Sequence, residues 1–139
     1  KTDIIMRVNG AIAGWVSISA EPWMPSPLSA IIIGAVGGLI MYLGTNLLNS
    51  LKLDDVVGAI PVHMFAGIWG TMIVPFSNPE TSYVTQFIGV ASVIAFVFIF
   101  SYIVISIIKA TVGLRISEEA EKLGTDKAEV GVIAYSIRD

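Results

Sequence analysis

Four apolar stretches, separated by short polar or proline-containing segments, occupy the first 110 residues. They cover about 4–20, 28–48, 56–76 and 83–108. A helix rises about 1.5 Å per residue, so about 20 residues cross a hydrocarbon layer of about 30 Å. The last three stretches have that length, whereas the first is short and carries Arg7 and Asn9 near its start. The pattern predicts an all-α integral membrane protein with four transmembrane helices in residues 1–110.

The segments between these stretches contain residues that end helices. Residues 21–27 include three prolines, which lack an N–H donor and fix φ. Residues 49–55 form a polar break, and residues 75–80 combine proline with asparagine. We therefore expect the helices to stop at these three places.

The basic residues predict the orientation of the helices. With four crossings, all eight Lys and Arg residues fall on one side of the membrane. The opposite side holds the loops 21–27 and 77–82, which contain none. Because basic loops stay in the cytoplasm, both termini are expected there, in a multi-pass protein of the cell (plasma or inner) membrane. Three crossings would divide the basic residues between the two sides.

Composition separates the membrane part from an aqueous tail. The chain is 55% hydrophobic and 14% charged, with a mean hydropathy of +0.81, whereas soluble domains carry about a quarter charged residues. Between Val56 and Ile108 the only charged residue is Glu80, while residues 111–139 hold 10 of the 19 charges. A water-soluble globular domain is therefore nearly excluded, and residues 111–139 are predicted to be a cytoplasmic C-terminal tail.

The same counts exclude several classes of function. The basic residues form no run, which argues against nucleic acid as a partner. The chain has no cysteine and one histidine, which excludes thiolate and multi-histidine metal sites within it. We expect no metal, no cofactor and no catalytic residue. Because the chain begins with Lys1 rather than methionine, we expect it to be a segment of a longer protein or a processed product.

Two glycine pairs indicate how the first two helices pack. Gly10 and Gly14 form one small-xxx-small pattern, and Gly34 and Gly38 form another. Such faces let helix backbones approach closely in lipid. A pore lining that needs space would use the same pattern, but tight helix packing is the favoured interpretation.

The third stretch begins with residues that shape a helix terminus. Asp54 and Asp55 precede the helix, where a carboxylate caps free N–H groups and meets the positive end of the helix dipole. Pro61 removes the hydrogen bond that its N–H would have made to the Val57 carbonyl. The helix is therefore expected to kink or fray at Pro61.

His63 is the residue most able to carry chemistry. The predicted helix places it about two turns from the helix start and near the middle of the membrane, where charge is costly. A neutral imidazole there could bind a small polar solute or pass a proton, or it could be a packed side chain bonded to a neighbouring helix. Asp55, Ala59 and His63 follow an i, i+4, i+8 spacing, so a narrow channel past His63 could run along small Ala59.

The tail contains one helix signal. Ser117 is a favourable N-cap and is followed by Glu118 and Glu119. Gly124 is a typical helix end, so a short helix over about 118–123 is predicted. This helix is either a docking or regulatory element or a solvated end of the chain.

Three ordered motifs resemble one family over the whole chain. Residues 9–14 read NGAIAG, and the third stretch combines Asp54-Asp55, His63 and the run GIWG at 67–70. The tail adds Gly113-Leu114-Arg115-Ile116, Glu118-Glu119, Asp126, Glu129, Gly131 and Ala134-Tyr135. On these residues the chain resembles the ammonium transporter (Amt/Rh) family, in the part that holds the last four of its eleven transmembrane helices and the cytoplasmic tail.

The resemblance implies a non-enzymatic transport function. It implies homotrimers in which each subunit conducts ammonium or ammonia through a hydrophobic pore lined by two histidines. His63 matches the histidine of the tenth helix, and the partner histidine lies outside this chain. Ser19 matches a position near the pore where many members have threonine. A PII-type regulatory protein is implied as a possible partner of the cytoplasmic tail.

Besides Ser19, the chain departs from the family pattern at three positions. Met64 stands where many members have glycine, Gly58 where some have aspartate, and Val130 where the tail often has histidine. Two other functions stay open at this point. One is an ammonium-sensing membrane domain of a signalling protein, and the other is a shortened subunit that assembles without conducting.

Overall fold

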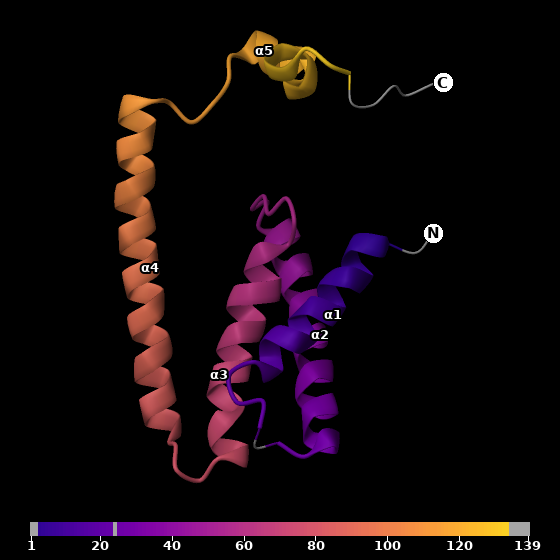
Figure 1. Ribbon diagram of the computed structural model, residues 1–139, viewed down its shortest axis with the longest axis vertical. Helices are drawn as coiled ribbons and strands as arrows, with labels where there is room; N and C mark the ends of the chain where they lie inside the picture. Colours follow the sequence, from indigo (N-terminus) through magenta and orange to yellow (C-terminus); the bar gives the residue numbers. More distant parts are fainter. Residues whose placement is uncertain (1–2, 24, 134–139) are drawn as a thin grey trace. The chain divides into compact units, whose positions relative to one another are not determined.

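The computed structural model describes residues 3–23 and 25–133, and every regular element in them is a helix (Figure 1). The chain forms two units, Lys1–Ala95 and Phe96–Asp139. Each unit is described by itself below. The first contains the three packed helical elements and the histidine, and the second contains the tail.

The first two helices begin at residues whose side chains cap them. Helix α1 spans Ile4–Ile18, and the Asp3 carboxylate accepts a hydrogen bond from the Met6 N–H at 3.1 Å. Helix α2 spans Pro27–Ser50, and the Ser26 hydroxyl accepts one from the Ser29 N–H at 3.2 Å. Proline is favourable in the first turn of α2, because the N–H that it lacks would have had no partner there.

The third apolar stretch forms two joined helical segments. A π-helix, η1, spans Ile60–Phe65, and the α-helix α3 continues it over Ala66–Ser77. The expected start at residue 56 is wrong. A kink or fraying was expected at Pro61, and the residues before Ala59 lie outside the helix, which agrees with fraying. The helix starts several residues later, so Pro61 lies in its first turn, where the missing N–H breaks no helical bond. The helix also continues through Pro75 and ends at Ser77.

Helix α4 spans Tyr83–Thr111, slightly longer than predicted, and includes the boundary between the two units. In the second unit α5 spans Glu118–Leu123, with the Ser117 hydroxyl accepting from the Ala120 N–H at 3.2 Å and Gly124 as the C-cap. These are the cap, bounds and end that the sequence predicted. A second π-helix, η2, spans Asp126–Val130 and was not predicted.

Three helical elements are long and apolar enough to cross a membrane: Pro27–Ser50, Ile60–Ser77 and Tyr83–Thr111. Helix α1 is apolar but has only 15 residues. None of the residues of α4 is buried, and large apolar side chains are exposed along most of its length. This is the surface of a helix that faces an apolar surrounding rather than water.

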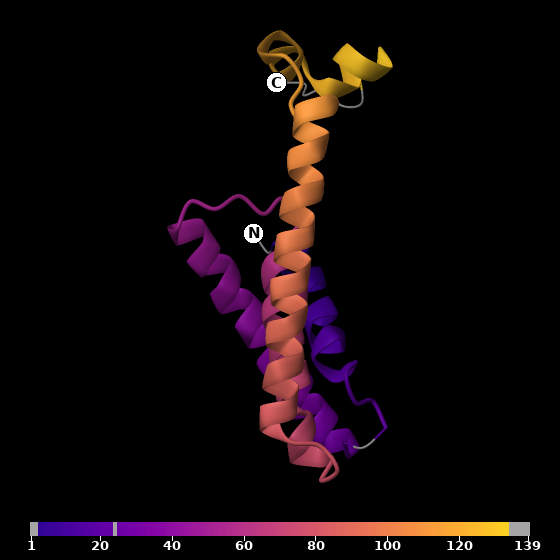
Figure 2. The ribbon, with the colours of Figure 1, turned by 90° about the vertical axis from the view of Figure 1, so that its left-hand side faces the viewer.

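Close backbone contacts join α1 to α2, which lie side by side (Figure 2). A Cβ atom added to Gly14 would lie 3.4 Å from the Gly34 carbonyl oxygen, and one added to Gly38 would lie 3.6 Å from the Gly10 carbonyl oxygen. The packing role predicted for both small-xxx-small patterns is therefore confirmed. The buried core beside this contact consists of Ala13, Met41, Val62 and Ala66, so it also includes η1 and α3.

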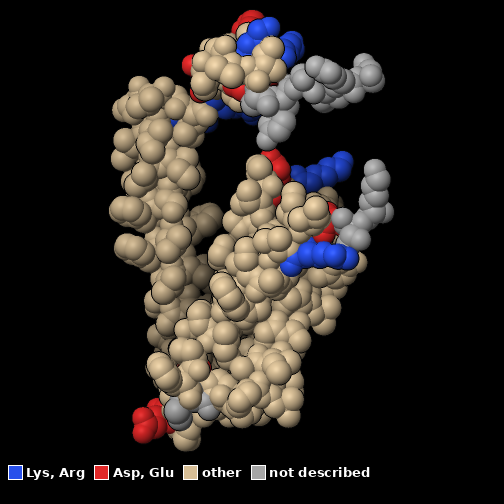
Figure 3. Space-filling view, turned by 45° about the vertical axis from the view of Figure 1, so that its right-hand side comes forward, with Lys and Arg blue, Asp and Glu red and all other residues tan. Residues whose placement is uncertain are grey.

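Side-chain hydrogen bonds join the two ends of this three-helix body. At one end the Asn9 amide donates to the Val57 carbonyl at 3.0 Å, and at the other the Asn78 amide donates to the Glu21 carboxylate at 3.0 Å. Helix α1 therefore runs in the same direction as η1 and α3. Figure 3 shows basic and acidic side chains gathered at one end of this body and acidic ones at the other, with an uncharged surface between.

Candidate functional site

The turn before η1 is closed by Asp55. Its two carboxylate oxygens accept hydrogen bonds from the N–H groups of Ala59 and Ile60, each at 2.8 Å. Asp55 thereby occupies the capping role that the sequence suggests, whereas Asp54 accepts no hydrogen bond from residues 3–23 or 25–133. Gly58 has a φ of 74°, a left-handed conformation that glycine adopts without strain and that a continuous helix does not allow.

Pro61 and Phe65 fix η1 against α2. Pro61 is fully buried. A Cβ atom added to Gly44 would lie 3.0 Å from Pro61 Cβ and 2.9 Å from a ring carbon of Phe65. Because Gly44 has no side chain, the face of η1 with Pro61 and Phe65 packs directly on α2. His63 and Met64 lie on the opposite face and point away from α2.

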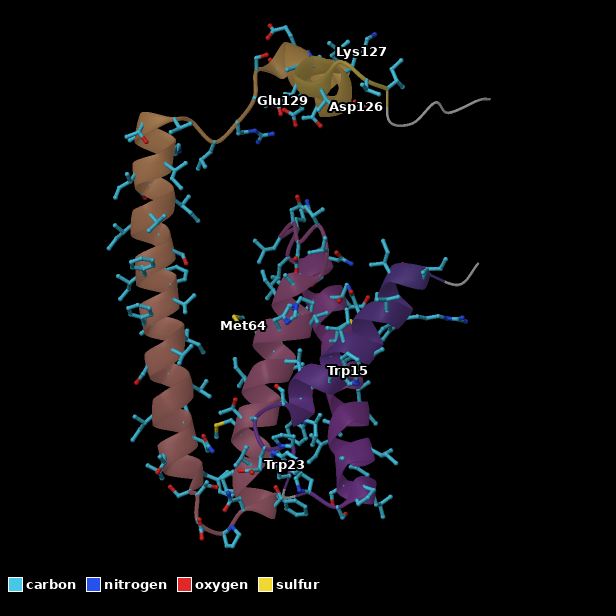
Figure 4. All side chains as sticks on the ribbon, in the orientation of Figure 1. Trp15, Trp23, Met64, Asp126, Lys127 and Glu129 are labelled. Atoms are coloured by element: carbon cyan, nitrogen blue, oxygen red, sulfur yellow. The ribbon has the colours of Figure 1, made fainter. Side chains whose placement is uncertain are left out.

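His63 lies in the first turn of the joined η1–α3 helix rather than two turns from its start. Its side chain is exposed and accepts or donates no hydrogen bond within the described residues. It borders an apolar cavity of about 400 Å³ whose wall comes from η1, α3 and the first part of α4: His63, Met64, Gly67, Ile68, Thr71, Gly89, Val90, Val93 and Ile94. Figure 4 shows Met64 projecting from η1 on the side away from α1.

The other two residues suggested for the pore do not border this cavity. Ala59 is the residue before η1 and is not among the residues that line the cavity. Ser19 is the exposed C-cap of α1, where its hydroxyl donates to the Val16 carbonyl at 2.8 Å. Neither Ala59 nor Ser19 shares this cavity with His63, and the pore roles of both remain predictions.

A buried serine that the sequence analysis did not select lies beside the same helices. The Ser17 hydroxyl donates to the Ala13 carbonyl at 2.8 Å and lies 3.4 Å from the Ala66 carbonyl. Cβ atoms added to Gly37 of α2 or Gly70 of α3 would each come within 2.8 Å of Ser17 atoms. Ser17 continues the small-residue stripe of Gly10, Ala13 and Gly14 at helical spacing, which is the signal that could have identified it.

The described residues include no group of three or more His, Cys, Asp or Glu side chains that could hold a metal ion. Among the residues that border the cavity, His63 is the titratable one. A neutral imidazole offers one N–H donor and one acceptor.

Ion pairs in the tail lie on its surface. Arg115 donates two hydrogen bonds to the Glu121 carboxylate, at 2.9 and 3.2 Å, and Lys122 pairs with Glu118 at 2.8 Å. All four side chains are more than half exposed, so the pairs contribute little to stability.

The tail residues Asp126, Lys127 and Glu129 lie in η2, as labelled in Figure 4. The Ala134-Tyr135 motif lies outside the described residues.

Comparison with known proteins identifies the family. The sequence profile described as the Ammonium Transporter Family matches residues 1–135. The chain is 34% identical to ammonium transporter Amt2 of Archaeoglobus fulgidus over 97% of its own length. It is 36% identical to a putative ammonium transporter of Synechocystis over 94%, and 30% identical to an ammonium transporter of Bacillus subtilis over 97%.

These alignments cover 33%, 30% and 37% of the three relatives, so the chain spans about a third of their length. The family profile covers almost the whole chain, and the helices that it matches include all three candidate membrane spans. The chain belongs to the ammonium transporter family, which is a family of transport proteins rather than enzymes.

Proposed function

We propose that this chain forms part of a membrane protein that conducts ammonium or ammonia through a hydrophobic pore, with His63 in the pore wall. The observation that carries the proposal is the unpartnered His63 imidazole beside an apolar cavity, in a chain of the ammonium transporter family. A histidine that only packs would be expected to bond a neighbouring helix, and no described residue bonds this one.

The chemistry of the site suits a small solute that exchanges a proton. An ammonium ion loses most of its hydration in an apolar passage, which favours the neutral molecule. A neutral imidazole donates one hydrogen bond and accepts another, so it can hold ammonia or pass the proton that ammonium releases. In this proposal His63 works with a second histidine from a segment outside this chain.

We place four crossings in residues 1–110, with the tail in the cytoplasm. Helix α1 is short, but Asn9 within it and Glu21 after it are bonded to Val57 before η1 and to Asn78 after α3. Because that helix is itself a candidate span, α1 with its flanking residues covers the same distance. Four crossings also leave every Lys and Arg on one side.

Further parts of the proposal rest on the order of the motifs. Three motifs support placing this chain in the last four of eleven helices: NGAIAG at 9–14, the Asp54-to-Gly70 motif with His63, and the tail motif. They likewise support a homotrimer in the cell membrane. The exposed α5, with its surface ion pairs, supports the tail as the contact for a PII-type regulator.

The experiment is transport by the protein that contains this chain, with and without His63→Asn. Asparagine keeps hydrogen-bonding groups but cannot take up or release a proton near neutral pH. Ammonium-evoked current in proteoliposomes should fall sharply in the variant, and uptake of labelled methylammonium measures transport independently. His63→Glu, which keeps a titratable group, is the matched comparison and should retain part of the current.

Assembly is checked by particle size, so that a loss of current is not a loss of folded protein. An unchanged current in a folded His63→Asn protein would contradict the proton-passing role. Binding of ammonium without any flux in the unmodified protein would favour the sensing alternative over transport.

A further inference from the structure

We propose that Asn9 is a positioning residue for His63, acting through the turn at 55–61; the inference rests on the pore role proposed above. The observation that carries it is the hydrogen bond from the Asn9 amide to the Val57 carbonyl, 3.0 Å long and spanning 48 residues of sequence. It joins α1 to the segment that leads into η1.

The Val57 carbonyl needs a donor from outside its own segment. In a continuous α-helix it would accept from the N–H of residue 61, but that residue is proline and has none. The Asn9 side chain supplies the donor instead. Since Val57 is exposed, water could satisfy this carbonyl as well, so the bond contributes little to stability. The hydrogen bond instead fixes the position of the turn, because it joins the turn to α1.

The turn is held from two sides. Asp55 binds the N–H groups of Ala59 and Ile60, which fixes the turn to the start of η1. Asn9 holds the opposite part of the turn, and a Cβ atom on Gly58 would lie 2.5 Å from Asn9 Nδ2. The φ of 74° at Gly58 favours glycine, and a side chain there would also displace the Asn9 amide.

His63 follows this turn within one turn of helix, and η1 is a π-helix rather than an ordinary α-helix. If the turn shifts, the backbone hydrogen bonds of η1 can change from the i→i+5 pattern to the i→i+4 pattern. Such a change rotates every side chain of η1 about the helix axis. Pro61 and Phe65 anchor one face of η1 on α2, while Asn9 and Asp55 fix where the helix begins. The direction of the His63 imidazole depends on both constraints.

The test uses the protein that contains this chain, in lipid vesicles, with Asn9→Leu and Asn9→Asp. Leucine has a similar size and no donor, and aspartate keeps the shape but presents oxygens to the carbonyl. The control is Asn49→Leu, because Asn49 is exposed on α2 and its side chain bonds none of the described residues. The readouts are the ¹⁵N shifts of the His63 imidazole, assigned by their loss in His63→Asn, and the maximal transport rate.

Both Asn9 variants should fold and assemble as the unmodified protein does, should shift the His63 nitrogen signals, and should lower the maximal rate by roughly tenfold. The Asn49→Leu control should do neither. Unchanged His63 signals in the Asn9 variants would overturn the inference, even if transport fell. If His63→Asn transports normally, the pore role fails, but the imidazole shifts still decide whether Asn9 positions His63.

Discussion

At the scale of single residues, the packing of the three-helix body depends on glycines that face Ser17. Ser17 is buried between three helices, and its hydroxyl bonds within α1 to the Ala13 carbonyl. The same hydroxyl lies 3.4 Å from the Ala66 carbonyl of α3, so backbone carbonyls satisfy it and neither α2 nor α3 needs a polar side chain there. Glycines at 37 and 70 lie there instead.

Two adjacent glycines of α2 provide a matched test of this packing. A Cβ atom at Gly37 would lie 2.8 Å from Ser17 Cβ and 2.9 Å from the Ala13 carbonyl oxygen, whereas one at Gly38 meets only the Gly10 carbonyl oxygen at 3.6 Å. Gly37→Ala should therefore destabilise the protein by roughly 1–3 kcal/mol, the usual cost of overpacking. Gly38→Ala should be neutral or stabilising, because alanine favours helix.

The measurement is the thermal unfolding midpoint in detergent of the protein that contains this chain, compared for both variants. An equal midpoint for Gly37→Ala and Gly38→Ala would show that the helices separate freely at Ser17, and would contradict the packing described here.

At the scale of elements, the bounds of α5 depend on nearby residues, whereas the start of the η1–α3 helix depends on a contact from another helix. The bounds of α5 follow from Ser117 and Gly124, because both signals act on backbone groups within the same turn. The start of η1 depends on Asp55 reaching N–H groups four and five residues later and on Asn9 from another helix. The apolar pattern contains neither contact, so the start was placed too early.

The site follows the same division between local and distant signals. His63 could be selected from the sequence because it is the only histidine in a long uncharged stretch. The pore role of Ala59 rested on its i+4 spacing from His63, and the π-helix that forms there was not predicted. Ser17 was missed because its role depends on Gly37 and Gly70, which lie on helices far away in the sequence.

The cap of α5 gives a test at this scale. Ser117→Ala removes the acceptor that the Ala120 N–H uses at 3.2 Å. Losing such a cap costs about 1 kcal/mol, a large change for a six-residue helix at the protein surface. Amide hydrogen exchange at Ala120 and Glu121 should become several-fold faster, by the factor that this energy implies.

Ser106→Ala is the control, because the Ser106 hydroxyl only bonds back to the Tyr102 carbonyl within α4. A similar acceleration in both variants would contradict a specific capping role.

At the scale of the whole molecule, the number of crossings determines which side the tail occupies. Helices α2, η1–α3 and α4 are candidate spans, and the hydrogen bonds of Asn9 and Glu21 to the residues at either end of η1–α3 supply the argument for the proposed fourth crossing. An even number of crossings returns the chain to its starting side, which is the side with all the basic residues.

A reporter fused after Asp139 tests this topology. A reporter that is active only in the cytoplasm should give full signal, and one that is active only outside the cytoplasm should give none. The same pair of reporters placed in the loop 77–82 should give the reverse result. Signal from the external reporter at the C-terminus would refute four crossings with cytoplasmic ends.

The last prediction concerns conduction by residues 1–139 alone. The chain spans about a third of the length of its curated relatives. The cavity beside His63 has walls from η1, α3 and the first part of α4, and it is open rather than enclosed. A pathway that keeps ammonia from lipid and protons from water needs walls on every side, and in the proposed pore the remaining walls and the second histidine come from other segments. We therefore expect that vesicles containing only residues 1–139 show no ammonium-dependent change in internal pH above the lipid background. Circular dichroism establishes that the inserted chain is helical, and vesicles with the whole protein are the positive control. Conduction by the helical 139-residue chain would show that its own helices complete the pathway, and would overturn the assignment of the other walls to segments outside it.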